Sequence, residues 1–166
     1  MILGMSLSAF VTVHVIISLI GIVAGIIVMF GMLGSNRMPG LTAIFLLFTI
    51  LTSATGFLIP PLVSEKLLPS HIIGALSLVL LAVACIALYG QKLSGGWRWI
   101  YVLTALISLY LNVFVLVVQA FQKVPALHVF APNGNEPPFA IAQGCVLLVF
   151  IVLGVLAVKR FRPAIV

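Results

Sequence analysis

Five long apolar runs dominate the sequence, and small or polar residues recur within them at helical spacing. The clearest pattern lies in residues 97–122, where one helical face, at about 100° per residue, carries Tyr101, Thr104, Ala105, Ser108, Asn112, Gln119 and Gln122. The other positions of this segment are mostly Leu, Val, Ile and Phe. A buried amide within a bilayer must find a hydrogen-bond partner or lose solvation energy. We therefore predict that this stripe faces protein and not lipid.

The apolar runs predict an all-α integral membrane protein, a compact bundle of five transmembrane helices. They lie at about 8–33, 41–61, 70–90, 97–121 and 139–158, and each is close to the ~20 residues that cross a bilayer. The connections between them contain Gly, Pro and Asn, and the longest, at 123–138, holds four prolines. None is long enough for a separate domain, so residues 1–166 are predicted to form a single transmembrane domain.

Two helices have faces that are predicted to pack closely. On the first, Gly21 and Gly25 form a GxxxG pattern, which lets a neighbouring backbone approach. On the third, the predicted inward face consists of His71, Gly74, Ala75, Ala82, Cys85 and Tyr89.

Composition supports a membrane location. The chain is 64% hydrophobic and 6% charged, with a mean hydropathy of +1.41, values that soluble globular domains do not reach. The net charge of +6 comes from basic residues placed between apolar runs. Such a distribution orients a membrane protein and does not indicate a nucleic-acid surface. We expect the surroundings to be a lipid bilayer, with no nucleic acid bound.

The charged residues also predict the orientation. One side of the predicted bundle receives six basic and no acidic residues: Arg37, Lys92, Arg98, Lys159, Arg160 and Arg162. The other side receives two basic and two acidic residues: Glu65, Lys66, Lys123 and Glu136. Basic loops stay in the cytoplasm, so the N-terminus is predicted outside and the C-terminus inside. Compact loops and no sorting signal favour a bacterial inner membrane.

All three histidines fall toward the predicted outer side. His14 and His71 enter from that side on the first and third helices, and His128 lies in the last loop. Two imidazoles inside a helical bundle are the ligands of a low-spin b-type haem. In this respect alone the chain resembles small membrane b-type cytochromes with bis-histidine haem. The resemblance implies electron transfer, with His14 and His71 as ligands of haem b or of a metal, and room for the ring beside Ser18, Gly21, Gly74 and Ala75.

Three alternatives stay open. A copper or zinc ion would use His14, His71 and His128. A quinone or another lipophilic small molecule needs hydrogen-bond donors at the end of an apolar slot, which Asn112, Gln119, Gln143 and His71 offer. In the third alternative these side chains only join helices, and the protein is a non-catalytic accessory or scaffold that packs against a membrane partner or forms a homo-oligomer.

Two further observations limit the chemistry. No Asp or Glu lies within a predicted span, which disfavours carboxylate-driven proton exchange. Cys85 and Cys145 lie in apolar runs without a redox or zinc-type spacing. Whether the protein is an enzyme does not follow from these residues.

Overall fold

The computed structural model describes residues 4–58 and 69–162, which form helices and no strand. The elements are α1 (Leu7–Leu33), α2 (Pro39–Gly56), α3 (Pro69–Cys85), the π-helical turn η2 (Ile86–Gly90), α4 (Trp97–Lys123), α5 (Pro125–His128) and α6 (Pro137–Arg160). Five of the helices, counting α3 and η2 as one, are long and apolar enough to cross a membrane. The prediction of an all-α chain with five such segments is confirmed.

Helix boundaries agree with the sequence-based ranges except at the end of α2. The sequence predicts a helix to residue 61, whereas α2 ends at Gly56; residues 57–58 form a turn and 59–61 lie outside the described residues. Glycine is a poor helix former, and Pro60 disfavours helical geometry at the residue before it. In the last connection, Pro125 begins a short helix that was not predicted, since proline suits a first helical position.

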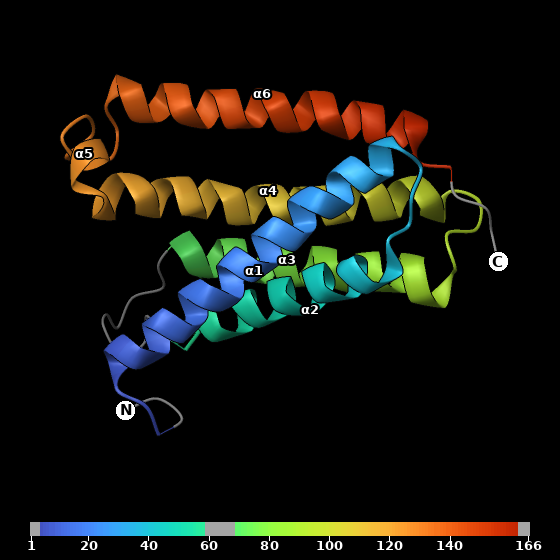
Figure 1. Cartoon of the computed structure of the whole chain (residues 1–166), viewed down its shortest axis with the longest axis horizontal. Helices are drawn as coiled ribbons and strands as arrows, with labels where there is room; N and C mark the ends of the chain where they lie inside the picture. Colours follow the sequence, from blue (N-terminus) through green and yellow to red (C-terminus); the bar gives the residue numbers. More distant parts are fainter. Residues whose placement is uncertain (1–3, 59–68, 163–166) are drawn as a thin grey trace.

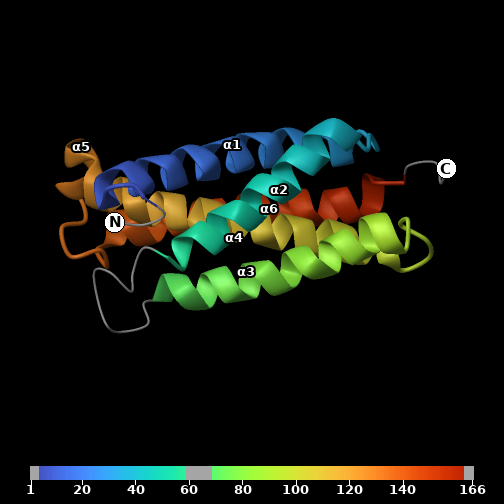
Figure 2. The same cartoon turned by 90° about the horizontal axis from the view of Figure 1, so that it is seen from below.

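The long helices form a four-helix group with a fifth helix at its side. α1 packs on α2, α2 on α3 and α3 on α4, and α4 also contacts α1 and α6. Figure 1 shows α1 crossing the bundle obliquely and coming near α6 toward its own C-terminal end. Figure 2 shows α1 and α3 along opposite sides of the bundle, with α4 between them. α5 lies where the chain passes from α4 to α6 (Figure 1).

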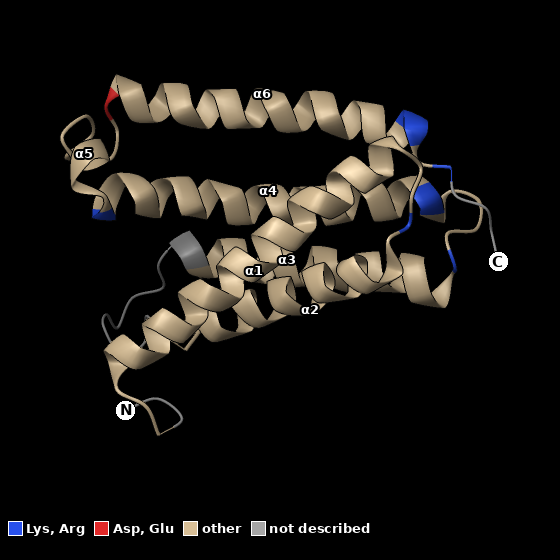
Figure 3. Ribbon diagram, viewed as in Figure 1, with Lys and Arg blue, Asp and Glu red and all other residues tan. Residues whose placement is uncertain are grey.

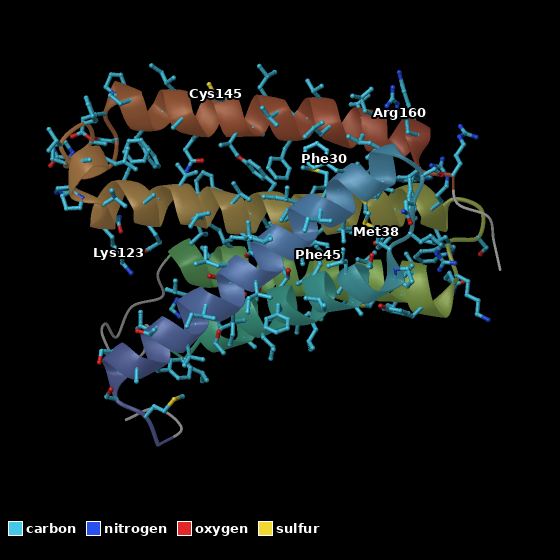
Figure 4. All side chains as sticks on the ribbon, viewed as in Figure 1. Phe30, Met38, Phe45, Lys123, Cys145 and Arg160 are labelled. Carbon is cyan, nitrogen blue, oxygen red and sulfur yellow. The ribbon has the colours of Figure 1, made fainter. Side chains whose placement is uncertain are left out.

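The GxxxG pattern of α1 lies in close contact with α2 and α4. A Cβ added to Gly25 would lie 2.7 Å from Leu109 Cδ1 and 2.8 Å from Phe45 Cδ1. A Cβ on Gly21 would lie 3.3 Å from the backbone nitrogen of Thr49. Phe45 is fully buried between the helices (Figure 4). The predicted close approach is therefore confirmed, with α2 and α4 as the neighbours of α1.

The buried face of α3 differs from the predicted one. Ser77, Leu81 and Ala84 are buried, whereas three residues of the predicted inward face are exposed: Ala75, Ala82 and Tyr89. Small residues occur around the whole circumference of α3, so they do not identify one face. The position of α3 between α2 and α4 decides which side is covered.

The two ends of the bundle differ in their charged residues (Figure 3). One end, here called the basic end, holds Arg37, Lys92, Arg98, Lys159, Arg160 and Arg162. The opposite end, here called the histidine end, holds the starts of α1 and α3, the end of α4 and α5, and therefore His14, His71, His128 and Lys123, with Glu136 before α6. The charge asymmetry expected from the sequence is thus present among the described residues; Glu65 and Lys66, which were expected at the histidine end, lie outside them.

Candidate functional site

His14, near the start of α1, joins this helix to α2. Its Nδ1 lies 2.6 Å from the hydroxyl oxygen of Thr55. The Thr55 hydroxyl has one proton, which it donates to the carbonyl oxygen of Leu51 at 2.7 Å. Nδ1 of His14 is then the donor to Thr55, and this tautomer leaves Nε2 as the acceptor atom of the ring. His14 is therefore both a helix-to-helix contact and a base with a lone pair on Nε2.

His71 lies in the first turn of α3 and is buried, with 7% of its surface exposed. Its ring centroid is 5.5 Å from that of Phe57, the residue directly after α2. Gly74 lies one turn further along α3, and a Cβ there would be 3.2 Å from the same phenyl ring. Phe57 therefore fills the space beside both His71 and Gly74.

The end of α2 contacts both imidazoles. Thr55 bonds His14, a Cβ on Gly56 would lie 3.5 Å from His14 Cε1, and Phe57 packs on His71. Thr55 and Phe57 are two positions apart, so they point to opposite sides of the chain at the helix end. The end of α2 therefore contacts both imidazole rings.

His128 lies apart from the other two histidines in its contacts. It is exposed on α5, and its Nδ1 is 3.2 Å from the carbonyl oxygen of Phe121. Within residues 4–58 and 69–162, no three His, Cys, Asp or Glu residues are grouped so that they could hold a metal ion. The described chain therefore does not assemble the three-histidine metal site considered from the sequence.

The polar stripe of α4 faces protein over most of its length. Tyr101, Ala105, Ser108 and Asn112 are buried and Gln119 is half-buried, whereas Gln122 at the helix end is exposed. This face packs toward α1, α2 and α3, since Leu109 beside it contacts Gly25 of α1. The prediction that the stripe avoids lipid is consistent with this burial.

Gln143 approaches α4 from the other side. Its Nε2 donates to the carbonyl oxygen of Phe114 at 3.1 Å and so ties α6 to α4. Asn112 and Phe114 are two positions apart on α4 and point in nearly opposite directions. The four side chains considered for a quinone are therefore divided: Asn112 and Gln119 lie on the inner face of α4, Gln143 lies between α4 and α6, and His71 lies on α3 against Phe57.

Three buried polar atoms have no hydrogen-bond partner among the described residues: Ser77 Oγ, Asn112 Nδ2 and Gln143 Oε1. An unpaired buried polar group costs about 1–3 kcal/mol, so each of these atoms would gain from a ligand or water that supplies the missing bond. Ser77 was not singled out by the sequence. The signal was present, because Ser77 is an isolated hydroxyl within an apolar helix.

A second link between α4 and α6 is made at the basic end. Nη1 of Arg98 donates to the carbonyl oxygens of Val158 and Phe161, both at 2.7 Å. The backbone nitrogen of Arg162 also donates to the hydroxyl of Ser35 at 2.8 Å. The C-terminal end of α6 is therefore held by polar bonds to α4 and to the loop between α1 and α2.

Between these two links, an open cavity of about 470 Å³ lies between α4 and α6. Its apolar walls come from both helices and include Leu103, Ile107, Tyr110, Leu147, Ile151 and Gly154. Lys159 is the charged residue of its lining. None of the site residues predicted from the sequence lines this cavity, because it depends on how two separate helices are spaced.

No family model matches this chain, and neither a curated protein nor a solved structure matches it.

Proposed function

We propose that this protein is a non-catalytic accessory membrane protein whose uncovered α6 surface packs against a partner helix. The observation that carries the proposal is the sparse burial of α6, where only Gln143 and Ala157 are buried. Two of the polar side chains considered for chemistry form bonds between helices: His14 bonds Thr55, and the Gln143 amide nitrogen bonds Phe114. Such bonds hold membrane helices together without any reaction.

The uncovered side of α6 carries an apolar stripe at helical spacing: Ile141, Cys145, Leu148 and Val152. Figure 4 shows Cys145 on the side of α6 that points away from α4. Gly144 is exposed beside this stripe, and small residues allow a second helix to approach closely. The partner helix belongs either to a second copy of this chain or to another membrane subunit.

A photoreactive residue at Leu148 tests this surface in native membranes. We expect a protein adduct from Leu148, and none from the same residue at Ile16, an exposed position of α1 that lies away from α6. Oxidation of native Cys145 in a Cys85→Ser chain then distinguishes the partners, since a second copy gives a species of twice 17.7 kDa. Only lipid adducts at both positions would contradict the proposal.

The membrane orientation is part of the same proposal. We place the basic end in the cytoplasm of a bacterium and the histidine end outside its inner membrane, because basic residues are retained on the cytoplasmic side. In a chain without native cysteines, an impermeant maleimide added to whole cells should label Asn133→Cys and not Lys92→Cys. The reverse labelling would overturn the orientation.

Electron transfer with haem b or a quinone-like ligand is the second candidate. This candidate is favoured because His14 and His71 contact the same end of α2 and therefore lie at a similar depth along the bundle. The test is an absorption spectrum of the detergent-purified protein, oxidised and then reduced with dithionite, with metal analysis of the same sample. A Soret band with sharp reduced α and β bands would replace the accessory proposal. A colourless, metal-free sample from haem-replete cells would support the accessory proposal.

A further inference from the structure

The cavity between α4 and α6 is an open apolar groove. Leu103 and Ile107 on α4 and Ile151 and Val155 on α6 line it and are also exposed on the outside of the bundle. Its volume of about 470 Å³ lies within the ~300–1,000 Å³ typical of small-molecule sites. In a bilayer the occupant of such a groove is drawn from the surrounding lipid, because the groove opens toward it.

The groove extends to the basic end of the bundle. Lys159 contributes to its lining there. Trp99 lies on the same face of α4 as Leu103, one turn nearer the basic end, and 46% of its surface is exposed. No acidic residue of the described chain lies at this end, whereas six basic residues do. Arg98 donates Nη1 to the carbonyls at the end of α6 and does not line the groove. Lys159 is therefore the charged side chain that the groove offers to a ligand.

We propose that this groove binds one anionic phospholipid, with an acyl chain against the apolar walls and the headgroup phosphate at Lys159. The apolar walls accept any acyl chain, so the cation determines the class of lipid by favouring a headgroup with net negative charge. A tryptophan at the level of the headgroups is typical of a membrane interface. The inference depends on the proposed membrane insertion, with the basic end at the cytoplasmic leaflet, and does not depend on a protein partner of α6.

The chain offers matched variants for both parts of the site. A Cβ on Gly154 would meet no atom within 4 Å, so Gly154→Leu places a side chain in the groove without displacing α4. Gly144 on the same helix is equally unobstructed and does not line the groove, so Gly144→Leu is its control. For the headgroup, Lys159→Gln has Arg160→Gln as its control, because Arg160 is adjacent in sequence and points away from α4 (Figure 4).

Native tryptophan fluorescence provides the readout. A Trp97→Phe chain leaves Trp99 as the emitter, and it is reconstituted in phosphatidylcholine vesicles that contain either brominated phosphatidylglycerol or brominated phosphatidylcholine as quencher. We expect phosphatidylglycerol to be preferred about five-fold, the effect of one basic residue at an anionic surface. Lys159→Gln should reduce the preference to below about two-fold and Arg160→Gln should leave it unchanged. Gly154→Leu should weaken quenching by both lipids, whereas Gly144→Leu should not.

Three results would overturn the lipid site. These are equal quenching by the two lipids in the parent chain, an unchanged preference in Lys159→Gln, and equal losses in Lys159→Gln and Arg160→Gln. The last result would show that lipid is attracted to the whole basic end and not to the groove. Failure of the lipid site can be distinguished from failure of the accessory proposal. Crosslinking from Leu148 can be absent while the phosphatidylglycerol preference persists, and the preference can be absent while crosslinking persists.

Discussion

α1 and α6 are similar in sequence character but very different in their surroundings. They have 27 and 24 residues, and their most apolar stretches have the same mean hydropathy. Nine residues of α1 are buried, against two of α6. The glycines explain much of the difference, because Gly25 allows Phe45 and Leu109 to contact the backbone of α1, whereas Gly144 and Gly154 face open space. Apolar character suits a helix to a membrane, but matched surfaces decide whether it is buried in protein.

The two helices are also held in different ways. α1 packs along α2 over much of its length, and His14 adds one polar bond at the histidine end. α6 is bonded to α4 by Gln143 toward one end and by Arg98 at the other, with the groove between these bonds. We therefore expect α1 to be sensitive to side-chain volume and α6 to be sensitive to the loss of individual polar bonds.

Leucine at a glycine position should give the largest difference between the two helices. Gly25→Leu should lower the free energy of unfolding by about 3 kcal/mol, because a Cβ alone would overlap Leu109 and Phe45. Gly154→Leu should change it by less than about 0.5 kcal/mol. Unfolding in detergent micelles followed by circular dichroism measures both. Similar losses in the two variants would show that α6 is packed as closely as α1.

Removal of the Arg98 side chain should release the end of α6. Arg98→Met deprives the carbonyls of Val158 and Phe161 of a charged donor, and such bonds contribute about 1.5–3 kcal/mol. Hydrogen exchange of the last turn of α6 should become faster, while that of α1 stays unchanged. Arg160→Met is the control. Equal protection of this turn in both variants would mean that the Arg98 bonds do not hold the end of α6.

The bond between His14 and Thr55 should have a moderate effect on α1. His14→Ala and Thr55→Val should each destabilise the protein by about 1 kcal/mol, and the double variant should show a coupling energy near 0.6 kcal/mol. The measurement is a double-mutant cycle of unfolding free energies. A coupling near zero would indicate that the bond adds nothing to the packing of α1 on α2.

The smallest effect is expected at Gln143. Gln143→Leu loses the bond to Phe114 but also removes a buried Oε1 that has no partner among the described residues, so the stability should change by less than about 0.5 kcal/mol. A loss above about 1.5 kcal/mol in the same unfolding assay would show that Oε1 has a bonding partner, such as a bound molecule between α4 and α6.

The sequence identified candidate polar residues but could not show which of them lie next to one another. The depth of a residue along the bundle follows from its position within its own helix. His14 and His71 were therefore correctly expected at the same end. Their relation to each other depends on where α2 ends and on which way Phe57 points. Likewise, the sequence left open whether Gln143 and Asn112 line one pocket; Asn112 is buried on α4, and Gln143 of α6 bonds the carbonyl of Phe114 on that helix.

The five long apolar helices, their approximate limits, the concentration of basic residues at one end and the close packing at Gly21 and Gly25 could all be predicted from the amino-acid sequence. These properties are local, because length, hydropathy, charge and small-residue spacing are read along a single helix. Three further features became known from the fold: which side of α3 is buried, that the end of α2 contacts both imidazoles, and that α4 and α6 leave a groove ending at Lys159. Each of these depends on the rotation and spacing of helices relative to one another, and almost any face of a uniformly apolar helix can serve as the packed one.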